Sequence, residues 1–113
     1  MQKFDYRSPR FTVDLPVQFA SQDVNFSGRC RDISREGMLL ELPEPVMPNA
    51  CGVVSVFDSR HGLLELQVRV AHSEATMGGM KFVYRTDFER DAVAQLVASL
   101  TTSQKRPALT LVD

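Results

Sequence analysis

The sequence lacks any apolar run that approaches the roughly 20 residues needed for a membrane-spanning helix. It also lacks an excess of Lys and Arg, because its formal net charge is −1, whereas nucleic-acid-binding domains are typically basic. The first ten residues, MQKFDYRSPR, carry charge without an apolar centre, which argues against a secretion signal. These absences predict a cytoplasmic protein with no membrane insertion and no DNA or RNA partner.

Cysteine and histidine are scarce, with two of each. Cys30, Cys51, His61 and His72 follow one another at intervals of 21, 10 and 11 positions, without a C-x-x-C pair. This spacing supports a zinc site only weakly, so no metal is expected. Reduced thiols are expected in a cytosolic protein, although the sequence leaves a disulfide between the two cysteines open.

Catalytic signatures are missing too, since the sequence has no nucleophile elbow, P-loop or dinucleotide fingerprint. Gly78-Gly79 is better explained as a hairpin turn than as a phosphate cradle. The carboxylates are scattered and form no recognisable acid–base pair. We therefore expect a binding module with no cofactor, not an enzyme. A metal-dependent or thiol enzyme is the competing hypothesis, which metal analysis of the purified protein would test.

Alternating hydrophobicity is the main pattern that is present. A chain of 113 residues with 43% hydrophobic residues has the size of one domain and can bury a core without disulfides or metals. Val13, Leu15, Val17 and Phe19 alternate with polar residues, as in a half-buried strand, and Pro16 indicates a sheet edge or a bulge. Similar patterns predict strands at 11–20, 24–32, 38–42, 53–57, 63–72 and 80–84.

One helix is predicted after Thr86. Thr86-Asp87-Phe88-Glu89 fits a capping box, in which the hydroxyl and the carboxylate each accept a hydrogen bond from an end amide. An apolar stripe at helical spacing follows, formed by Phe88, Ala92, Val93, Leu96, Val97 and Leu100. We expect a six-stranded antiparallel β-barrel with one C-terminal helix at 11–101, between a flexible basic N-terminal segment at 1–10 and a flexible tail at 102–113.

Two polar segments could bind a ligand. In the first, Tyr6-Arg7-Ser8-Pro9-Arg10, two guanidinium groups near a rigid proline could grip phosphates or a guanine edge. In the second, Asp32-Ile33-Ser34-Arg35-Glu36-Gly37, a carboxylate could accept hydrogen bonds from guanine, a hydroxyl could add another, and Gly37 could adopt a positive φ. Taken alone, the first is an ordinary basic terminus and the second an ordinary β-turn.

Together the two segments resemble the PilZ domain family, bacterial receptor modules for the second messenger cyclic di-GMP. The similarity extends over about residues 6–100. It includes the start Pro9-Arg10-Phe11, the complete Asp32-x-Ser34-x-x-Gly37 motif, and Gly79-Met80-Lys81-Phe82 before the helix. The resemblance implies the same barrel with a terminal helix.

The resemblance also implies roles for particular residues. Arg10 matches the second arginine of the family's Arg-x-x-x-Arg motif, whose arginines grip phosphates and guanine edges. Asp32, Ser34 and Gly37 match the second motif, whose Asp and Ser recognise guanine on the barrel surface. The arginine segment of the family closes over the nucleotide when it binds.

The sequence departs from the family pattern at Tyr6, four positions before Arg10, where the family has its first arginine. Arg7 stands one position later, and a shift of one residue turns a side chain to the other face of an extended segment. Arg7 could still reach the ligand, and Tyr6 could stack on a base. His72 stands where the family often has tryptophan, and it is a second possible stacking contact.

The leading hypothesis is a cyclic di-GMP receptor that switches an unknown protein partner through its N-terminal segment. The alternative is a degenerate PilZ-fold adaptor, for example in pilus or motility machinery, that binds proteins but no nucleotide.

Overall fold

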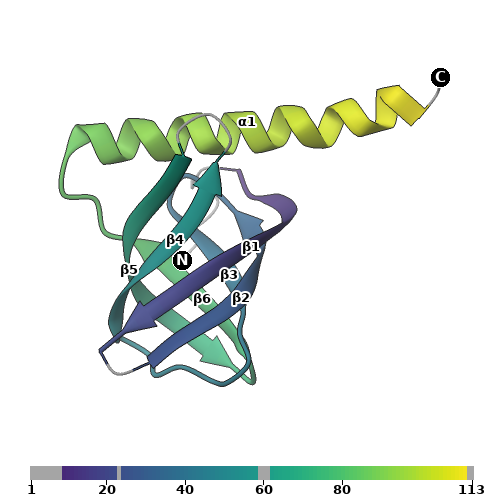
Figure 1. Ribbon diagram of the computed structural model, residues 1–113. Coiled ribbons are helices and arrows are strands. Elements are labelled where there is room, and N and C mark those ends of the chain that lie inside the picture. Colours follow the sequence, from purple (N-terminus) through teal and green to yellow (C-terminus); the bar gives the residue numbers. More distant parts are fainter. Residues whose placement is uncertain (1–8, 23, 59–61, 112–113) are drawn as a thin grey trace, which may run out of the picture.

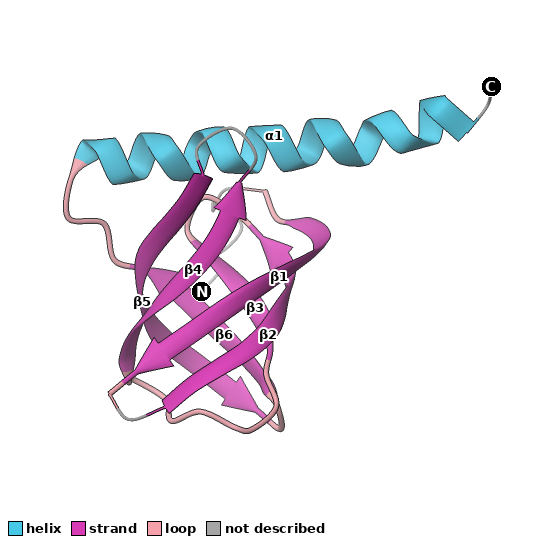
Figure 2. Ribbon diagram, viewed as in Figure 1, coloured by secondary structure: helices cyan, strands magenta, loops and turns pink. Residues whose placement is uncertain are grey.

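The structure, a computed structural model, describes residues 9–22, 24–58 and 62–111, with side chains as far as Leu100. Six strands close into an antiparallel barrel in the order β1-β2-β3-β6-β5-β4, and one helix lies across an end of it (Figures 1 and 2). The elements are β1 (Phe11–Ser21), β2 (Val24–Ile33), β3 (Gly37–Glu41), β4 (Cys51–Asp58), β5 (Gly62–Glu74), β6 (Met77–Phe82) and α1 (Asp87–Leu111). The predicted fold class is confirmed.

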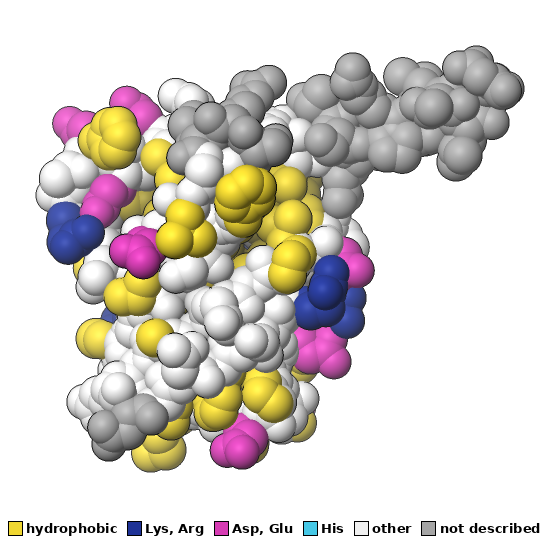
Figure 3. All heavy atoms as spheres, in the orientation of Figure 1, with side chains coloured by type: hydrophobic (Ala, Val, Ile, Leu, Met, Phe, Trp, Pro, Cys, Tyr) yellow, Lys and Arg dark blue, Asp and Glu magenta, His cyan; other side chains and the backbone are white. Residues whose placement is uncertain are grey.

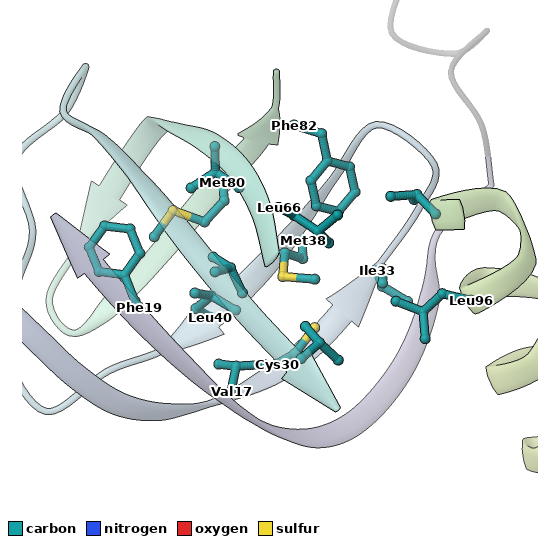
Figure 4. Packing of buried hydrophobic residues seen from close by; sticks show 14 of the residues in the cluster. Val17, Phe19, Cys30, Ile33, Met38, Leu40, Leu66, Met80, Phe82 and Leu96 are labelled. Carbon is teal, nitrogen blue, oxygen red and sulfur yellow. The ribbon is translucent and has the colours of Figure 1, made fainter. Parts of the chain in front are cut away.

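The core fills the barrel with the inward-facing side chains of all six strands (Figure 4). Alternation along β1 buries Val13, Val17 and Phe19, as the sequence predicts. Helix α1 closes one mouth of the barrel, because its side chains Val93 and Leu96 are 0% and 1% exposed within the same cluster. Burial of apolar surface at about 25 cal/mol per Å² thus stabilises the barrel and the docked helix together.

Thr86 caps the start of α1 as predicted, whereas the Glu89 carboxylate binds an amide that precedes the cap. The Glu89 amide donates to Thr86 Oγ1 at 3.2 Å, and the Glu89 carboxylate accepts from the Arg85 amide at 2.7 Å. The predicted apolar stripe of the helix is wrong at one position, because the Phe88 side chain is not buried but 78% exposed. Phe88 lies in the first turn, and burial of the stripe begins one turn later, at Ala92.

Pro16 follows a β-bulge, which is one of the two features that the sequence predicts there, the other being a sheet edge. The pairing of β1 with β2 shifts register between Thr12 and Leu15, immediately before the proline. Pairing of β1 with β4 begins at Val17. The missing amide of Pro16 therefore falls just outside the ladder between β1 and β4.

The prediction of a turn at Gly78-Gly79 is wrong. The turn between β5 and β6 is formed by Ala75 and Thr76, and both glycines lie within β6. Gly78 pairs with Ser73 and Gly79 with His72 on β5. The turn comes earlier because β5 continues to Glu74. Gly79 instead leaves room for the His72 ring, and Gly78 leaves room for the side chains of Val46 and Met80.

The outer surface carries both ion pairs and apolar side chains (Figure 3). On β1, β2 and β3, Arg29 and Arg31 both contact Asp14, and Arg31 also contacts Glu41. Helix α1 runs to Leu111, beyond the end expected near residue 101. No helix among the described residues is long and apolar enough to cross a membrane.

Candidate functional site

Arg10 and Asp32 meet where β1 begins and β2 ends. Antiparallel pairing places Thr12 opposite Asp32, so Arg10 emerges beside the carboxylate. Arg10 Nε donates to Asp32 Oδ2 at 3.1 Å, and the Arg10 side chain is 55% exposed. Such an exposed pair contributes little to stability because water and salt screen it. Its two charges are therefore available to a ligand at small cost to the fold.

Ser34 organises the turn that follows Asp32. Its side chain is only 2% exposed, and its Oγ accepts from the amides of Glu36 at 3.0 Å and Gly37 at 3.3 Å. The Ser34 amide in turn donates to the Gly37 carbonyl at 2.9 Å. The hydroxyl thus holds the turn from inside, as in other serine-stabilised turns.

Gly37 is required for a reason different from the predicted one. Its φ is not positive, since Gly62 is the one glycine with a positive φ in the described part of the chain. A Cβ at Gly37 would instead lie 2.1 Å from the carbonyl oxygen of Met80. Gly37 pairs with Lys81, so the missing side chain lets β3 approach β6 closely.

A recess of about 150 Å³ lies beside this turn. Arg10, Glu36 and Gly37 line one side of it, and His72, Gly79 and Lys81 line the other. The exposed His72 ring lies so close to Gly79 that a Cβ there would be 2.3 Å from Nε2. The fold therefore brings Arg10, Asp32, Ser34, Gly37 and His72 together. The other two candidates, Arg7 and Tyr6, lie outside the described residues.

The recess combines cations and hydrogen-bond acceptors. Arg10 and Lys81 line the recess and supply positive charge, and the Asp32 carboxylate lies beside Arg10. Asp32 Oδ1 is buried and accepts no hydrogen bond from any described residue. A buried acceptor without a donor is costly. This arrangement suits an anion that also carries N–H donors.

Comparisons with known proteins identify the family of the chain. The family model for the PilZ domain matches residues 5–101. The chain belongs to the PilZ domain family. The comparison with curated proteins found no match.

Solved PilZ structures share the fold. The PilZ domain of CeSA from a cellulose-synthesizing bacterium superposes with a TM-score of 0.74 at 18% identity, over 83% of this chain and 99% of that one. The PilZ domain of YcgR from Escherichia coli, solved with c-di-GMP, gives 0.76 at 13% identity, over 90% and 95%. The complex of K. pneumonia MrkH with c-di-GMP gives 0.73 at 18% identity, over 89% of this chain and 54% of that one.

Sequence reasoning missed part of the site in this PilZ domain. Gly79, Lys81 and Glu36 line the recess, although the sequence alone indicates no ligand-binding role for them. Their proximity to Arg10 depends on pairing between β3, β5 and β6. The one local signal was the unusual Gly78-Gly79 pair, because glycine within a strand often marks close approach of another group.

The described residues of the weak zinc hypothesis, Cys30, Cys51 and His72, do not form a metal-binding cluster. Cys30 is buried in the core, where loss of hydration raises the pKa of its thiol to about 11, and Cys51 is exposed. Both are free thiols, and His61 lies outside the described residues. Among the residues that the structure describes, no three His, Cys, Asp or Glu side chains form a cluster able to hold a metal.

Two larger hollows lie away from this site. One hollow of about 530 Å³ runs along β1, β2 and β4 beside Pro16 and Phe57. The other, of about 440 Å³, has Phe19, Phe26 and Met47 among its lining residues. The recess beside Arg10 is smaller, but it adjoins an ion pair and a buried acceptor. Ligand sites depend on such convergent polar groups as well as on volume.

Proposed function

We propose that this PilZ domain is a cytoplasmic receptor for cyclic di-GMP and acts without catalysis. The observation that carries the proposal is the Arg10–Asp32 pair at the edge of the recess, directly before the turn organised by Ser34. Arginine suits phosphate because its forked donors match phosphate oxygens. The structures of the YcgR PilZ domain and of MrkH, both solved with c-di-GMP, support the same ligand class.

Guanine recognition follows from the chemistry of Asp32. A carboxylate accepts hydrogen bonds, and guanine presents N1 and N2 donors on one edge, whereas adenine lacks that pair. The Asp32 side chain is 27% exposed beside Arg10, so a base can approach the carboxylate from solvent. A cyclic dinucleotide is larger than the recess, so it would rest across it, with phosphate near Arg10 and His72 against a base.

The N-terminal segment supplies the proposed output. Arg10 belongs to the site, and the chain that precedes it contains Arg7 and Tyr6. A ligand held by Arg10 therefore lies next to this segment. We propose that binding changes the segment's arrangement and thereby its contact with a protein partner.

Tyr6 favours a second candidate function. Because it replaces the family's first arginine, a protein-binding adaptor that takes no nucleotide is the alternative. Loss of one bidentate contact to a charged ligand costs roughly 1.5–3 kcal/mol, or about 10- to 150-fold in affinity. The adaptor would use the same barrel without the switch.

Isothermal titration with cyclic di-GMP and cyclic di-AMP tests the proposal. We expect binding of cyclic di-GMP that weakens as salt rises, because salt screens exposed charges, and weaker binding of cyclic di-AMP. Equal affinity for both dinucleotides would remove the guanine-reading role of Asp32. Absence of binding heat and of competition against a labelled dinucleotide would favour the adaptor.

A further inference from the structure

Tyr84 connects the linker before α1 to the turn of the candidate site. Its hydroxyl donates to the carbonyl oxygen of Arg35 at 2.5 Å, across 49 positions of sequence. Arg35 lies inside the turn between Ser34 and Gly37. The bond therefore reaches the middle of the candidate ligand-binding turn from a segment outside the recess.

A second bond from the same segment reaches the next carbonyl. The Phe82 amide donates to the Glu36 carbonyl oxygen at 2.9 Å. The Ser34 hydroxyl meanwhile accepts from the amides of Glu36 and Gly37. The Ser34 hydroxyl therefore holds two amides of the turn, while Tyr84 and Phe82 hold two of its carbonyls. These bonds together fix the orientation of the peptide groups in the turn.

The Tyr84 ring is itself held in place. The Arg90 guanidinium carbon lies 4.6 Å from the ring centroid, in a cation–π contact from α1. The Phe82 ring packs at 5.8 Å between centroids. The Tyr84 ring also packs against the hydrophobic core. A ring restrained in this way holds its hydroxyl oxygen within hydrogen-bonding distance of the Arg35 carbonyl.

We propose that Tyr84 is a positioning residue for the ligand-binding turn, acting through its hydroxyl bond to Arg35. This inference rests on the proposed cyclic di-GMP receptor function. The bond fixes the peptide between Arg35 and Glu36, and Glu36 and Gly37 form one wall of the recess beside Arg10. Arg90 keeps the ring over the turn, so α1 contributes to the site without touching the ligand.

The variant Tyr84→Phe removes the hydroxyl and keeps the ring. We expect its affinity for cyclic di-GMP to fall about 3- to 10-fold, the value of one neutral hydrogen bond. Amide hydrogen exchange at Glu36 and Gly37 should become faster. Without the Tyr84 bond the turn opens more often, and the hydrogen bonds from these two amides to Ser34 Oγ then break more often. Exchange in β4 and β5 should be unchanged.

Ser21→Ala is the matched control. Ser21 Oγ donates to the Cys51 carbonyl at 2.6 Å, the same kind of bond, at the far end of β1 from Arg10. We expect it to lower stability about as much as Tyr84→Phe and to leave affinity unchanged. An equal loss of affinity in both variants would mean general destabilisation and would overturn the inference.

A double-mutant cycle separates positioning from simple loss of structure. Arg90→Gln should weaken binding in the wild-type background but add little in the Tyr84→Phe background, because Arg90 acts through the hydroxyl. Fully additive losses would contradict this route. Wild-type binding with unchanged affinity in Tyr84→Phe would overturn this inference alone, whereas a wild type that does not bind would remove the receptor function and the inference with it.

Discussion

The His72 ring lies against Gly79 in the neighbouring strand, in space that a side chain at Gly79 would occupy. His72 is exposed and lines the recess with Arg10. Glycine at position 79 therefore determines where the imidazole can rest, and hence the shape of the surface offered to a base.

Gly79→Ala should displace the ring and weaken cyclic di-GMP binding several-fold, with little loss of stability. The clash involves the end of a side chain that can rotate away, and alanine is favoured over glycine within a strand. Titration calorimetry and thermal unfolding measure the two effects. In a His72→Ala background the substitution should cost nothing further, and an additional loss there would show that the ring is not the cause.

Arg10→Ala should reduce cyclic di-GMP binding below detection and change the free energy of unfolding by no more than about 0.5 kcal/mol, since the ion pair is exposed. Arg10→Lys should give intermediate binding, because lysine keeps the charge without the fork. The matched control is Arg29→Ala, which removes a similarly exposed arginine paired with Asp14. If both alanine variants weaken binding equally, the loss reflects the lower total positive charge of the protein and not a specific contact of Arg10 with the ligand.

Gly37→Ala should destabilise the barrel by about 1–3 kcal/mol and weaken binding, because the new Cβ would meet the Met80 carbonyl of β6. Urea unfolding measures the loss. Gly62→Ala provides the comparison: its φ of +76° strains any L-residue, but no atom lies within 4 Å of the added Cβ. We expect that variant to cost about 1 kcal/mol and to bind normally. Normal binding by Gly37→Ala would remove the turn from the site.

Local patterns were enough to predict most strands, the helix and the turn of the candidate site. The alternation along β1 and the capping pair Thr86 and Glu89 concern neighbours in sequence, and the structure confirms both. The bonds from Ser34 to the following amides are equally local.

What could not be predicted depends on pairing between distant strands. The need for glycine at position 37 arises from a carbonyl on β6, and the contact of His72 with Gly79 arises from the register between β5 and β6. The Tyr84–Arg35 bond joins residues 49 positions apart. A single sequence shows the residue types in such contacts but not which of them meet.

Tyr6→Arg should tighten cyclic di-GMP binding by roughly 10- to 150-fold if the missing guanidinium limits this protein, and titration against the wild type measures the gain. Arg7→Ala is the companion variant. Unchanged affinity in Tyr6→Arg together with a severe loss in Arg7→Ala would mean that Arg7 already fills the role. If neither Arg7→Ala nor Arg10→Ala alters the titration, the segment is a basic terminus and the adaptor function is favoured.

The free energy of unfolding should fall as pH rises above about 9. Burial raises the pKa of Cys30 from 9.0 to about 11 and that of Tyr84 from 10.0 to about 12. The unfolded chain therefore releases these protons at lower pH than the folded chain, so this stabilisation is complete below pH 9 and is lost through pH 11 to 12. Urea titrations from pH 7 to 11 measure the slope. Cys30→Ala should reduce it, and an unchanged slope would exclude Cys30 as a source.

The bulge before Pro16 has a mechanical consequence for the barrel. Described pairing joins β1 to β2 along most of its length but to β4 only through Val17–Ala20, and a hollow of about 530 Å³ adjoins Pro16. Among the described residues, the first half of β1 therefore pairs with one strand, β2, and not with β4. A stretch with fewer hydrogen bonds needs less free energy to deform. Arg10 is joined to that compliant stretch. We therefore expect a ligand bound to Arg10 to displace this half of β1 more readily than the strands that pair on both sides.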